Sequence, residues 1–160
     1  MERLFDATDV RILTILRADA SRSKAEIGRQ IDLAPSAVFA RLRRLESNHV
    51  IRGYRVELDY GLLGLPLIAF VFVSEKKPAL TGKTLAALSS LGIAEEIHRI
   101  SGEDCFVLKV RSKDTDDLRE KLDRIGDIRT VAGVRTHIVL QSVEATAPKL
   151  IGSITRNGQV

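Results

Sequence analysis

The sequence predicts an α+β protein built from two unlike domains. The first third of the chain repeats apolar residues at the three- and four-residue spacing of amphipathic helices, with capping residues between the repeats. The remainder alternates short stretches rich in Val, Ile and Phe with two helical stretches. Because the pattern changes near residue 60, we expect a small helical domain followed by a helix-and-sheet domain.

Polar residues mark the starts of the first two helices. Asp6 and Asp9 suit the N-terminus of a helix that ends near Ala18, because acidic groups in the first turn interact favourably with the helix dipole. Ser23 and Glu26 have the spacing of a capping box and open a second helix. Both starts are local signals that need no tertiary contact.

A third helix follows a turn at residues 32–34. Pro35 suits its first position, since the missing N–H would be unpaired there. On a helical wheel, one apolar stripe consists of Val38, Leu42 and Leu45, and the opposite side of Ser36, Ala40, Arg43 and Ser47. Two helices joined by a tight turn, the second with an outward polar face, are typical of a helix-turn-helix.

Positive charge concentrates on this third helix and the residues after it. The formal net charge of the chain is +4, and residues 33–56 alone contain five arginines against Glu46. A solvated helix face is the alternative explanation of such a cluster. The helix-turn-helix pattern around the arginines favours a surface that contacts the phosphates of double-stranded DNA.

Small residues on the outer face would let the helix approach base edges, and arginines beside them reach guanine or phosphate. Phe39 lies between the two faces of the helix, so it is either a residue at the rim of the core or an apolar contact to a thymine methyl group. The candidate DNA-binding residues are Ser23, Lys24, Pro35, Ser36, Ala37, Phe39, Ala40, Arg41, Arg43 and Arg44.

Residues 50–58 alternate apolar and polar side chains, which predicts a strand or wing leaving the first domain. Residues 60–64 suit a linker or entry turn. We therefore expect a winged helix-turn-helix domain at residues 1–50, joined by a wing and linker strand at 51–64 to the second domain at 65–143. An irregular tail follows at 144–160.

The second domain reads as β-α-β-β-α-β, which is the order of a ferredoxin-like fold. The expected strands are residues 65–74, 93–100, 105–111 and 134–143, and the expected helices are 78–91 and 115–125. In the first of these helices we expect Leu80, Leu85 and Leu88 to face inward. Such a sheet has one face covered by helices, so the other must meet water or a partner, which favours a homodimer.

Composition narrows the function classes. A hydrophobic content of 44% suffices for packed cores, and the single cysteine, Cys105, excludes an internal disulfide and fits a reducing cytoplasm. We expect no membrane span and no signal peptide, because no apolar run approaches about 20 residues. Cys105 with His98 or His137 could in principle form a nucleophile and base, but strand positions of this kind are more typical of packing, and we expect no enzyme, metal or cofactor.

Five segments in the correct order, residues 4–13, 33–46, 50–54, 101–110 and 135–140, together resemble the Lrp/AsnC family. These are the leucine-responsive, feast/famine transcription regulators. The resemblance implies a sequence-specific DNA-binding regulator, cytoplasmic and associated with the prokaryotic nucleoid. It also implies a dimer, often assembled to an octamer or higher, and a small-molecule effector, usually an amino acid, bound between dimers. The effector-binding residues implied are Ser101, Gly102, Glu103, Asp104, Cys105, Arg135 and Thr136.

The chain departs from the family pattern at two sites that matter for function. Many members have Ser at the N-cap of the recognition helix, where this chain has Ala34, and losing that cap costs about 0.5–2 kcal/mol. The effector loop lacks an aromatic residue and a second acid at their usual positions, with Asp104 offset by one residue. The identity of the effector therefore does not follow from the resemblance.

Two other classes stay open at the level of the sequence. The chain would serve equally well as an architectural protein that compacts DNA without any effector. It would alternatively be an enzyme, since ferredoxin-like domains host many chemistries, although no convergent cluster of acid, base and metal ligands supports this.

Overall fold

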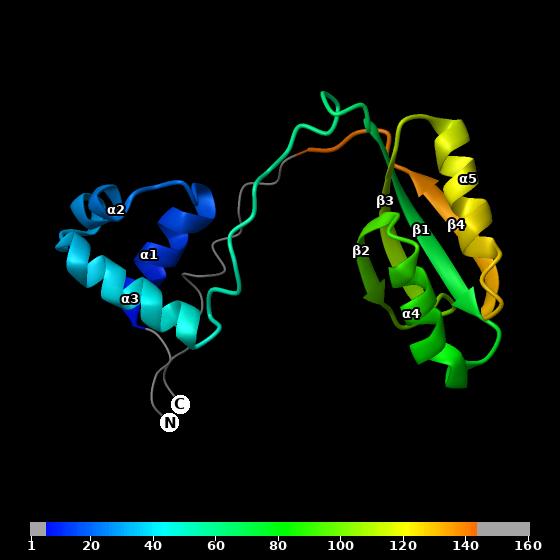
Figure 1. Ribbon diagram of the computed structural model, residues 1–160, viewed down its shortest axis with the longest axis horizontal. Coiled ribbons are helices and arrows are strands. Elements are labelled where there is room, and N and C mark those ends of the chain that lie inside the picture. The colour runs from blue at the N-terminus through cyan, green and yellow to red at the C-terminus, as the bar shows by residue number, and fades with distance from the viewer. Residues whose placement is uncertain (1–5, 144–160) are drawn as a thin grey trace. The chain divides into compact units, whose positions relative to one another are not determined.

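The structure is a computed structural model that describes residues 6–143 (Figure 1). Among the described residues, one compact unit ends at Glu57 and a second is Leu58–Val143. The tail predicted at residues 144–160 lies outside the described residues. Each unit has its own core, and each is described by itself.

The first unit consists of the three predicted helices, α1 (Ala7–Ala18), α2 (Lys24–Ile31) and α3 (Pro35–Ser47). Asp6 caps α1, with reciprocal side-chain and backbone hydrogen bonds to Asp9. Ser23 and Glu26 form the same capping box at α2. Both predicted helix starts are confirmed, because a capping box depends only on residues three apart in sequence.

The helices pack around a small aliphatic core. Its buried members are Ile12, Ile27, Ile31, Val38 and Leu42, with Ile15, Leu16, Leu33 and Ile51 packed against them. The turn between α2 and α3 is tight, because Asp32 adopts a left-handed conformation with φ 59° and the Leu33 N–H donates to the Gly28 carbonyl at 2.9 Å. The helix-turn-helix is therefore held both by its core and by its backbone.

The second unit is a four-stranded antiparallel sheet in the order β2-β3-β1-β4, with two helices. The elements are β1 (Leu67–Glu75), a 3₁₀ turn η1 (Pro78–Leu80), α4 (Thr81–Ser90), β2 (Ala94–Arg99), β3 (Phe106–Ser112), α5 (Thr115–Gly126) and β4 (Val131–Ile138). The predicted ferredoxin-like order is confirmed, and the two central strands are β1 and β3.

One face of the sheet packs against the helices (Figure 1). Alternate residues of β1 and β3 are fully buried there together with residues of α4 and α5: Ala69, Val71, Val73, Phe106, Leu108, Val110, Leu88 and Ile125. The strict alternation of burial along β3 is the signature of a half-buried strand.

The other face of the sheet carries aromatic and charged side chains. Glu95 forms ion pairs with Arg111 at 2.6 Å and Lys109 at 3.2 Å, and the Arg111 guanidinium lies 3.8 Å from the centre of the Tyr60 ring. Burial raises the pKa of Glu95, but hydrogen bonds from Arg111, Lys109 and Tyr60 outweigh it, so the net pKa is lowered. Tyr60 is thereby fixed on the sheet.

The predicted strand between the two units is wrong. Residues 52–59 form no helix or strand, and Val56 is 82% exposed. The alternation of apolar residues was a valid extended pattern, but a strand also requires a neighbour to accept and donate its backbone hydrogen bonds. The described part of a single chain provides no such neighbour for this segment.

Two smaller predictions in the second unit also need correction. Leu85 is 41% exposed and does not face inward, because the buried side of α4 consists of Thr84 and Leu88, four residues apart, and Leu85 lies beside it. The last strand runs Val131–Ile138 rather than 134–143. It ends there because its partner β1 begins at Leu67, and only one further backbone bond among the described residues, from Val139 to Ile68, follows.

The turn of the helix-turn-helix gives a first prediction. A Cβ atom on Gly28 would lie 2.4 Å from the carbonyl oxygen of Leu33, which is backbone and cannot move freely. We expect Gly28→Ala to lower the free energy of unfolding of the first unit by about 1–3 kcal/mol. Denaturant titration, followed by the amide NMR signals of each unit separately, would measure it.

Gly82→Ala in α4 is the matched control, because a Cβ atom there would have no described neighbour within 4 Å. Alanine is the better helix former, so this variant should leave the first unit unchanged and stabilise the second by up to about 1 kcal/mol. A neutral or stabilising effect of Gly28→Ala would show that the α2–α3 turn is not closely packed.

Candidate DNA-binding surface and effector loop

The recognition helix α3 has the two faces that its sequence predicts. Val38, Leu42 and Leu45 are buried, whereas the opposite face of Ser36, Ala40, Arg43 and Ser47 is more open to solvent. Ala34 occupies the N-cap position and makes no side-chain capping bond, while Pro35 is the first helical residue. The helix start therefore depends on proline and on the packed turn before it.

A buried carboxylate connects α3 to α1. Asp9 has 0% relative exposure and accepts hydrogen bonds from Arg41 Nη1 at 2.9 Å and from Arg44 Nη2 at 2.5 Å. It also accepts the backbone N–H of Asp6 at 2.8 Å. A carboxylate taken out of water needs such donors, since charge-assisted hydrogen bonds replace its lost hydration.

Asp6 completes this network at its exposed side. Its carboxylate accepts a hydrogen bond from Arg41 at 2.7 Å, and this bond is the main reason that the pKa of Asp6 lies below its ordinary value. The same contacts raise the pKa of Arg41. Arg41 is thus held between two carboxylates, and its side chain is only 27% exposed.

The three arginines of α3 consequently differ. Arg41 and Arg44, both candidate DNA contacts in the sequence, are tied to the N-terminus of α1. Arg43 has no carboxylate within ion-pair distance among the described residues, and its guanidinium lies 5.6 Å from the centre of the Phe39 ring. Of these three, Arg43 alone combines a place on the outer face with a charge that no acid in the described part of the chain neutralises.

Phe39 stays outside the core. It is 47% exposed, so of its two interpretations the structure does not support a place in the core rim. The ammonium group of Lys24 and the guanidinium of Arg43 both lie 5.6 Å from its ring centre. Ser23 is engaged locally, because its hydroxyl bonds to Glu26 at 2.8 Å, and Ala37 is half-buried.

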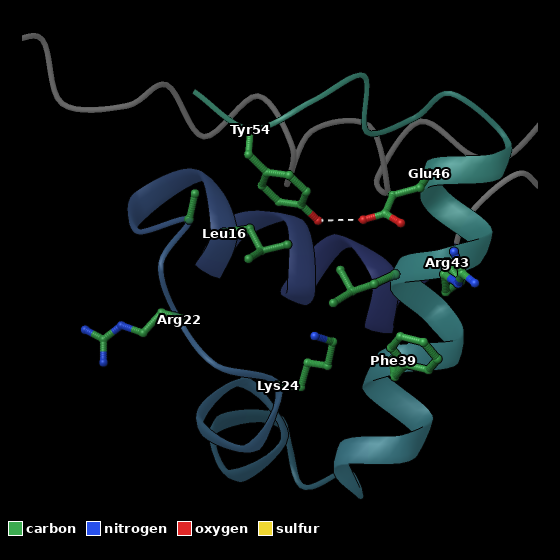
Figure 2. A pocket seen from close by; sticks show the side chains of 9 residues that line it. Leu16, Arg22, Lys24, Phe39, Arg43, Glu46 and Tyr54 are labelled. Carbon is green, nitrogen blue, oxygen red and sulfur yellow. Dashed lines mark hydrogen bonds between the residues drawn. The ribbon is translucent and has the colours of Figure 1, made fainter. Parts of the chain in front are cut away.

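Lys24, Phe39 and Arg43 border a hollow of about 360 Å³ in the first unit (Figure 2). Its wall includes Tyr54, whose hydroxyl donates to Glu46 at 2.9 Å. Burial, and then the hydrogen bond to Glu46, raise the pKa of Tyr54, which keeps its proton on the phenol. No sequence pattern indicates this hollow, since its lining comes from several separate segments.

In the second unit, the loop predicted to hold an effector joins β2 to β3. Ser101, Gly102 and Glu103 are exposed, and Gly102 has φ +122°, a conformation that favours glycine. Asp104 forms an ion pair with Arg135 of β4. The loop is thereby connected across the sheet to a strand much further along the chain.

Arg135 lies on the sheet face that carries the aromatic residues. Its guanidinium is 5.3 Å from the centre of the Phe72 ring, and Phe72 contacts His137 edge-on at 5.4 Å. Asp104 and Arg135 therefore present a carboxylate and a guanidinium side by side, above an aromatic surface.

The remaining predicted effector residues do not join this pair. Thr136 follows Arg135 in β4 and so points to the opposite face, where it lines a separate hollow of about 510 Å³ between α5 and β4. Cys105 is half-buried and packs against the core. Within one chain, the predicted set thus divides between two faces of the sheet.

Two negative findings apply to the part of the chain that the structure describes. No group of three or more His, Cys, Asp and Glu side chains is arranged to hold a metal ion. No helix there is both long and apolar enough to cross a membrane.

A helix-turn-helix with an exposed basic face, followed by a ferredoxin-like unit, defines a class of two-domain DNA-binding regulators. The family models agree: residues 5–46 match the AsnC-type helix-turn-helix domain and residues 68–148 match the Lrp/AsnC ligand binding domain. The chain belongs to the Lrp/AsnC family of transcription regulators.

Individual relatives match along most of the chain. The regulator AldR of Mycobacterium tuberculosis is 31% identical over 147 residues, which cover 89% of this chain and 82% of AldR. The leucine-responsive regulatory protein of Haemophilus influenzae is 31% identical over 147 residues, 90% of this chain and 89% of the relative. The solved feast or famine regulatory protein of M. tuberculosis, complexed with L-methionine, has a TM-score of 0.82 at 30% identity, covering 89% of this chain and 96% of that one.

The buried carboxylate generates a prediction. Asp9→Asn removes the charge that holds two guanidinium groups while keeping the size of the side chain. We expect it to lower the free energy of unfolding of the first unit by about 1.5–3 kcal/mol, the range for hydrogen bonds to a charged group. Urea denaturation at neutral pH would measure the loss.

Asp6→Asn is the matched control. Asparagine caps a helix as well as aspartate does, and the Asp6 carboxylate is half-exposed, so we expect a loss below about 1 kcal/mol. Equal losses for the two variants would contradict the special role of the buried carboxylate.

Proposed function

We propose that this regulator binds double-stranded DNA through the exposed face of α3, and that a small effector, an amino acid, modulates the binding. The observation that carries the DNA part is the division among the three arginines of α3. Asp9 holds Arg41 and Arg44, whereas Arg43 stands beside the small residues Ser36 and Ala40 on the outer face. Small side chains permit close approach to base edges, and a guanidinium without a carboxylate partner suits guanine or phosphate.

We assign the other candidate residues by their surroundings. Lys24, Phe39 and Pro35 are all exposed. The ammonium group of Lys24 suits a phosphate, and the ring of Phe39 suits an apolar contact to a thymine methyl group. Arg41 and Arg44 act through the position of α3 rather than by reading bases. Ser23 contributes by capping α2, which leads into the turn.

The effector site is proposed at the loop of residues 101–105 together with Arg135. An amino acid carries one carboxylate and one ammonium group, and the Asp104–Arg135 pair offers a complementary carboxylate and guanidinium. That the related feast or famine protein is complexed with L-methionine supports an amino acid of this kind. Thr136 lies on the other face, so it would join the site only from a second copy of the chain.

Two exposed features of the chain suit the formation of an oligomer. The aromatic face of the sheet and the alternating segment 51–58 both suit contact with a second copy, which supports a homodimer that assembles further to an octamer or higher. In such a dimer, DNA half-sites should lie roughly 34–36 Å apart or at a multiple of that distance. The protein would act in the cytoplasm, at the nucleoid.

The effector would act by linkage. If it favours one assembly over another, it changes how many helix-turn-helix units reach successive grooves at once. Because coupling between sites is reciprocal, DNA must change the affinity for the effector by the same factor.

A titration with individual amino acids, read by thermal shift and by gel mobility of a bound duplex, tests the effector. We expect at least one amino acid to raise the melting temperature and to change the DNA affinity. No response from any of them would favour the alternative function, an architectural DNA-compacting protein that needs no effector.

Arg43→Ala gives the prediction for DNA reading. Removing the exposed guanidinium should relax the preference between bases. It should also make the free energy of binding to the preferred duplex less favourable by about 1–3 kcal/mol. Competition between a preferred and a random duplex at several salt concentrations would measure both quantities.

Arg29→Ala, an exposed arginine of α2, serves as the control and should leave base preference unchanged. If Arg43→Ala weakened all duplexes equally and made the salt dependence shallower, Arg43 would be a phosphate contact and not a base reader.

A further inference from the structure

The hollow in the first unit has the size and lining of a small-molecule site. Its volume of about 360 Å³ falls at the lower end of ligand pockets, roughly 300–1,000 Å³. Leu16 and Leu42 supply an apolar floor, while Lys24, Phe39 and Arg43 border it. Figure 2 shows Lys24, Phe39 and Arg43 close together on one side of the hollow.

The charges around the hollow favour an anion. Neither Lys24 nor Arg43 has a carboxylate within ion-pair distance in the described part of the chain, and both lie against the same phenyl ring. The acidic group of the lining, Glu46, already accepts the hydrogen bond of Tyr54. Arg22 is paired with Asp19 at 2.9 Å and points away from the hollow (Figure 2).

A bare inorganic anion would use only half of this surface. It would satisfy Lys24 and Arg43 but leave the leucine floor and the exposed ring of Phe39 without contacts. An aromatic body fits that floor, because flat rings pack against leucine side chains and stack with an exposed phenyl group. A carboxylate attached to the ring would then reach the two cations.

We propose that the hollow binds a small aryl carboxylate, in a site separate from the effector loop of the second unit. The ligand would sit on Leu16 and Leu42 with its carboxylate between Lys24 and Arg43. This site lies within the DNA-binding unit itself, so its ligand could regulate DNA binding without any change in the oligomeric assembly.

Such a ligand would oppose DNA binding, a consequence that rests on the proposed function. Lys24, Phe39 and Arg43 belong both to the rim of the hollow and to the proposed DNA surface. A carboxylate held by these two cations neutralises charge that phosphates or guanine would otherwise meet. Because coupling is reciprocal, bound DNA must lower the affinity of the protein for this ligand by the same factor.

Indole-3-acetate is a suitable probe, because the protein contains no tryptophan and the indole emission therefore reports only the ligand. We expect saturable binding to the full-length protein. Lys24→Gln and Arg43→Gln should each weaken it at least about tenfold, the effect of losing one charged hydrogen bond. Arg29→Gln, which removes an equal charge outside the hollow, should leave it unchanged.

Ala20→Leu provides a test that keeps every charge. Ala20 lines the hollow, so a leucine there would occupy part of its volume and should weaken indole-3-acetate binding while DNA binding persists. Unchanged probe binding in this variant, an equal loss in Arg29→Gln, or no saturable binding to the unaltered protein would each overturn the proposal.

Failure of this inference and failure of the proposed function give different results. If the protein retains a specific duplex but binds no indole-3-acetate, the hollow is not a ligand site and the DNA-binding function stands. If the probe binds with the expected variant pattern but no duplex is retained, the hollow is a ligand site and the DNA-binding function fails.

Discussion

The position of the recognition helix depends on one buried carboxylate. Asp9 is fully shielded from water at the start of α1, and it is satisfied by guanidinium groups from α3 and by a backbone N–H. A buried charge in this arrangement is costly to leave unpaired, so the pairing restricts where α3 can lie relative to α1. The aliphatic core supplies most of the burial, but such a core tolerates small shifts of a helix. A charged network with defined directions does not, so it adds to the orientation that the buried stripe of Val38, Leu42 and Leu45 already gives to α3.

This arrangement assigns the arginines of α3 to two different roles, which are holding the helix in place and facing outward. Two arginines hold the helix, and the third, Arg43, is left for the outer face beside Phe39 and Lys24. The positive charge of the helix is therefore not uniformly available to DNA, despite its appearance in sequence. This division leaves Arg43 without a described carboxylate partner, and Lys24 of α2 also has none. Both cations lie at the edge of a hollow, which is why that hollow suits an anion. In the second unit a similar pairing joins Asp104 to Arg135 at the loop for which we propose effector binding.

The fold was largely predictable because its signals are local. Capping boxes, helical periodicity and strand alternation involve residues a few positions apart, and they indicated the three helices and the βαββαβ order. The site was less predictable because its contacts are not local: nothing around Arg44 indicates that Asp9, thirty-five positions earlier, holds it. The wing strand at residues 50–58 was wrong for a related reason, since alternation predicts extended backbone but not a hydrogen-bonding neighbour. Thr136 and Arg135 lie on opposite faces of the sheet, because adjacent strand residues point in opposite directions, so a site that uses both residues would need a second copy of the chain.

The most direct measurement is the NMR response of the arginine side chains of α3 when a specific duplex is added. The Nε–H signals of Arg41, Arg43 and Arg44 report each guanidinium separately. If Asp9 holds Arg41 and Arg44 in position while Arg43 contacts DNA, only the Arg43 signal should shift substantially. A large shift of Arg44, with loss of its hydrogen bond to Asp9, would show that the arginine leaves α1 to bind DNA, and would contradict the account.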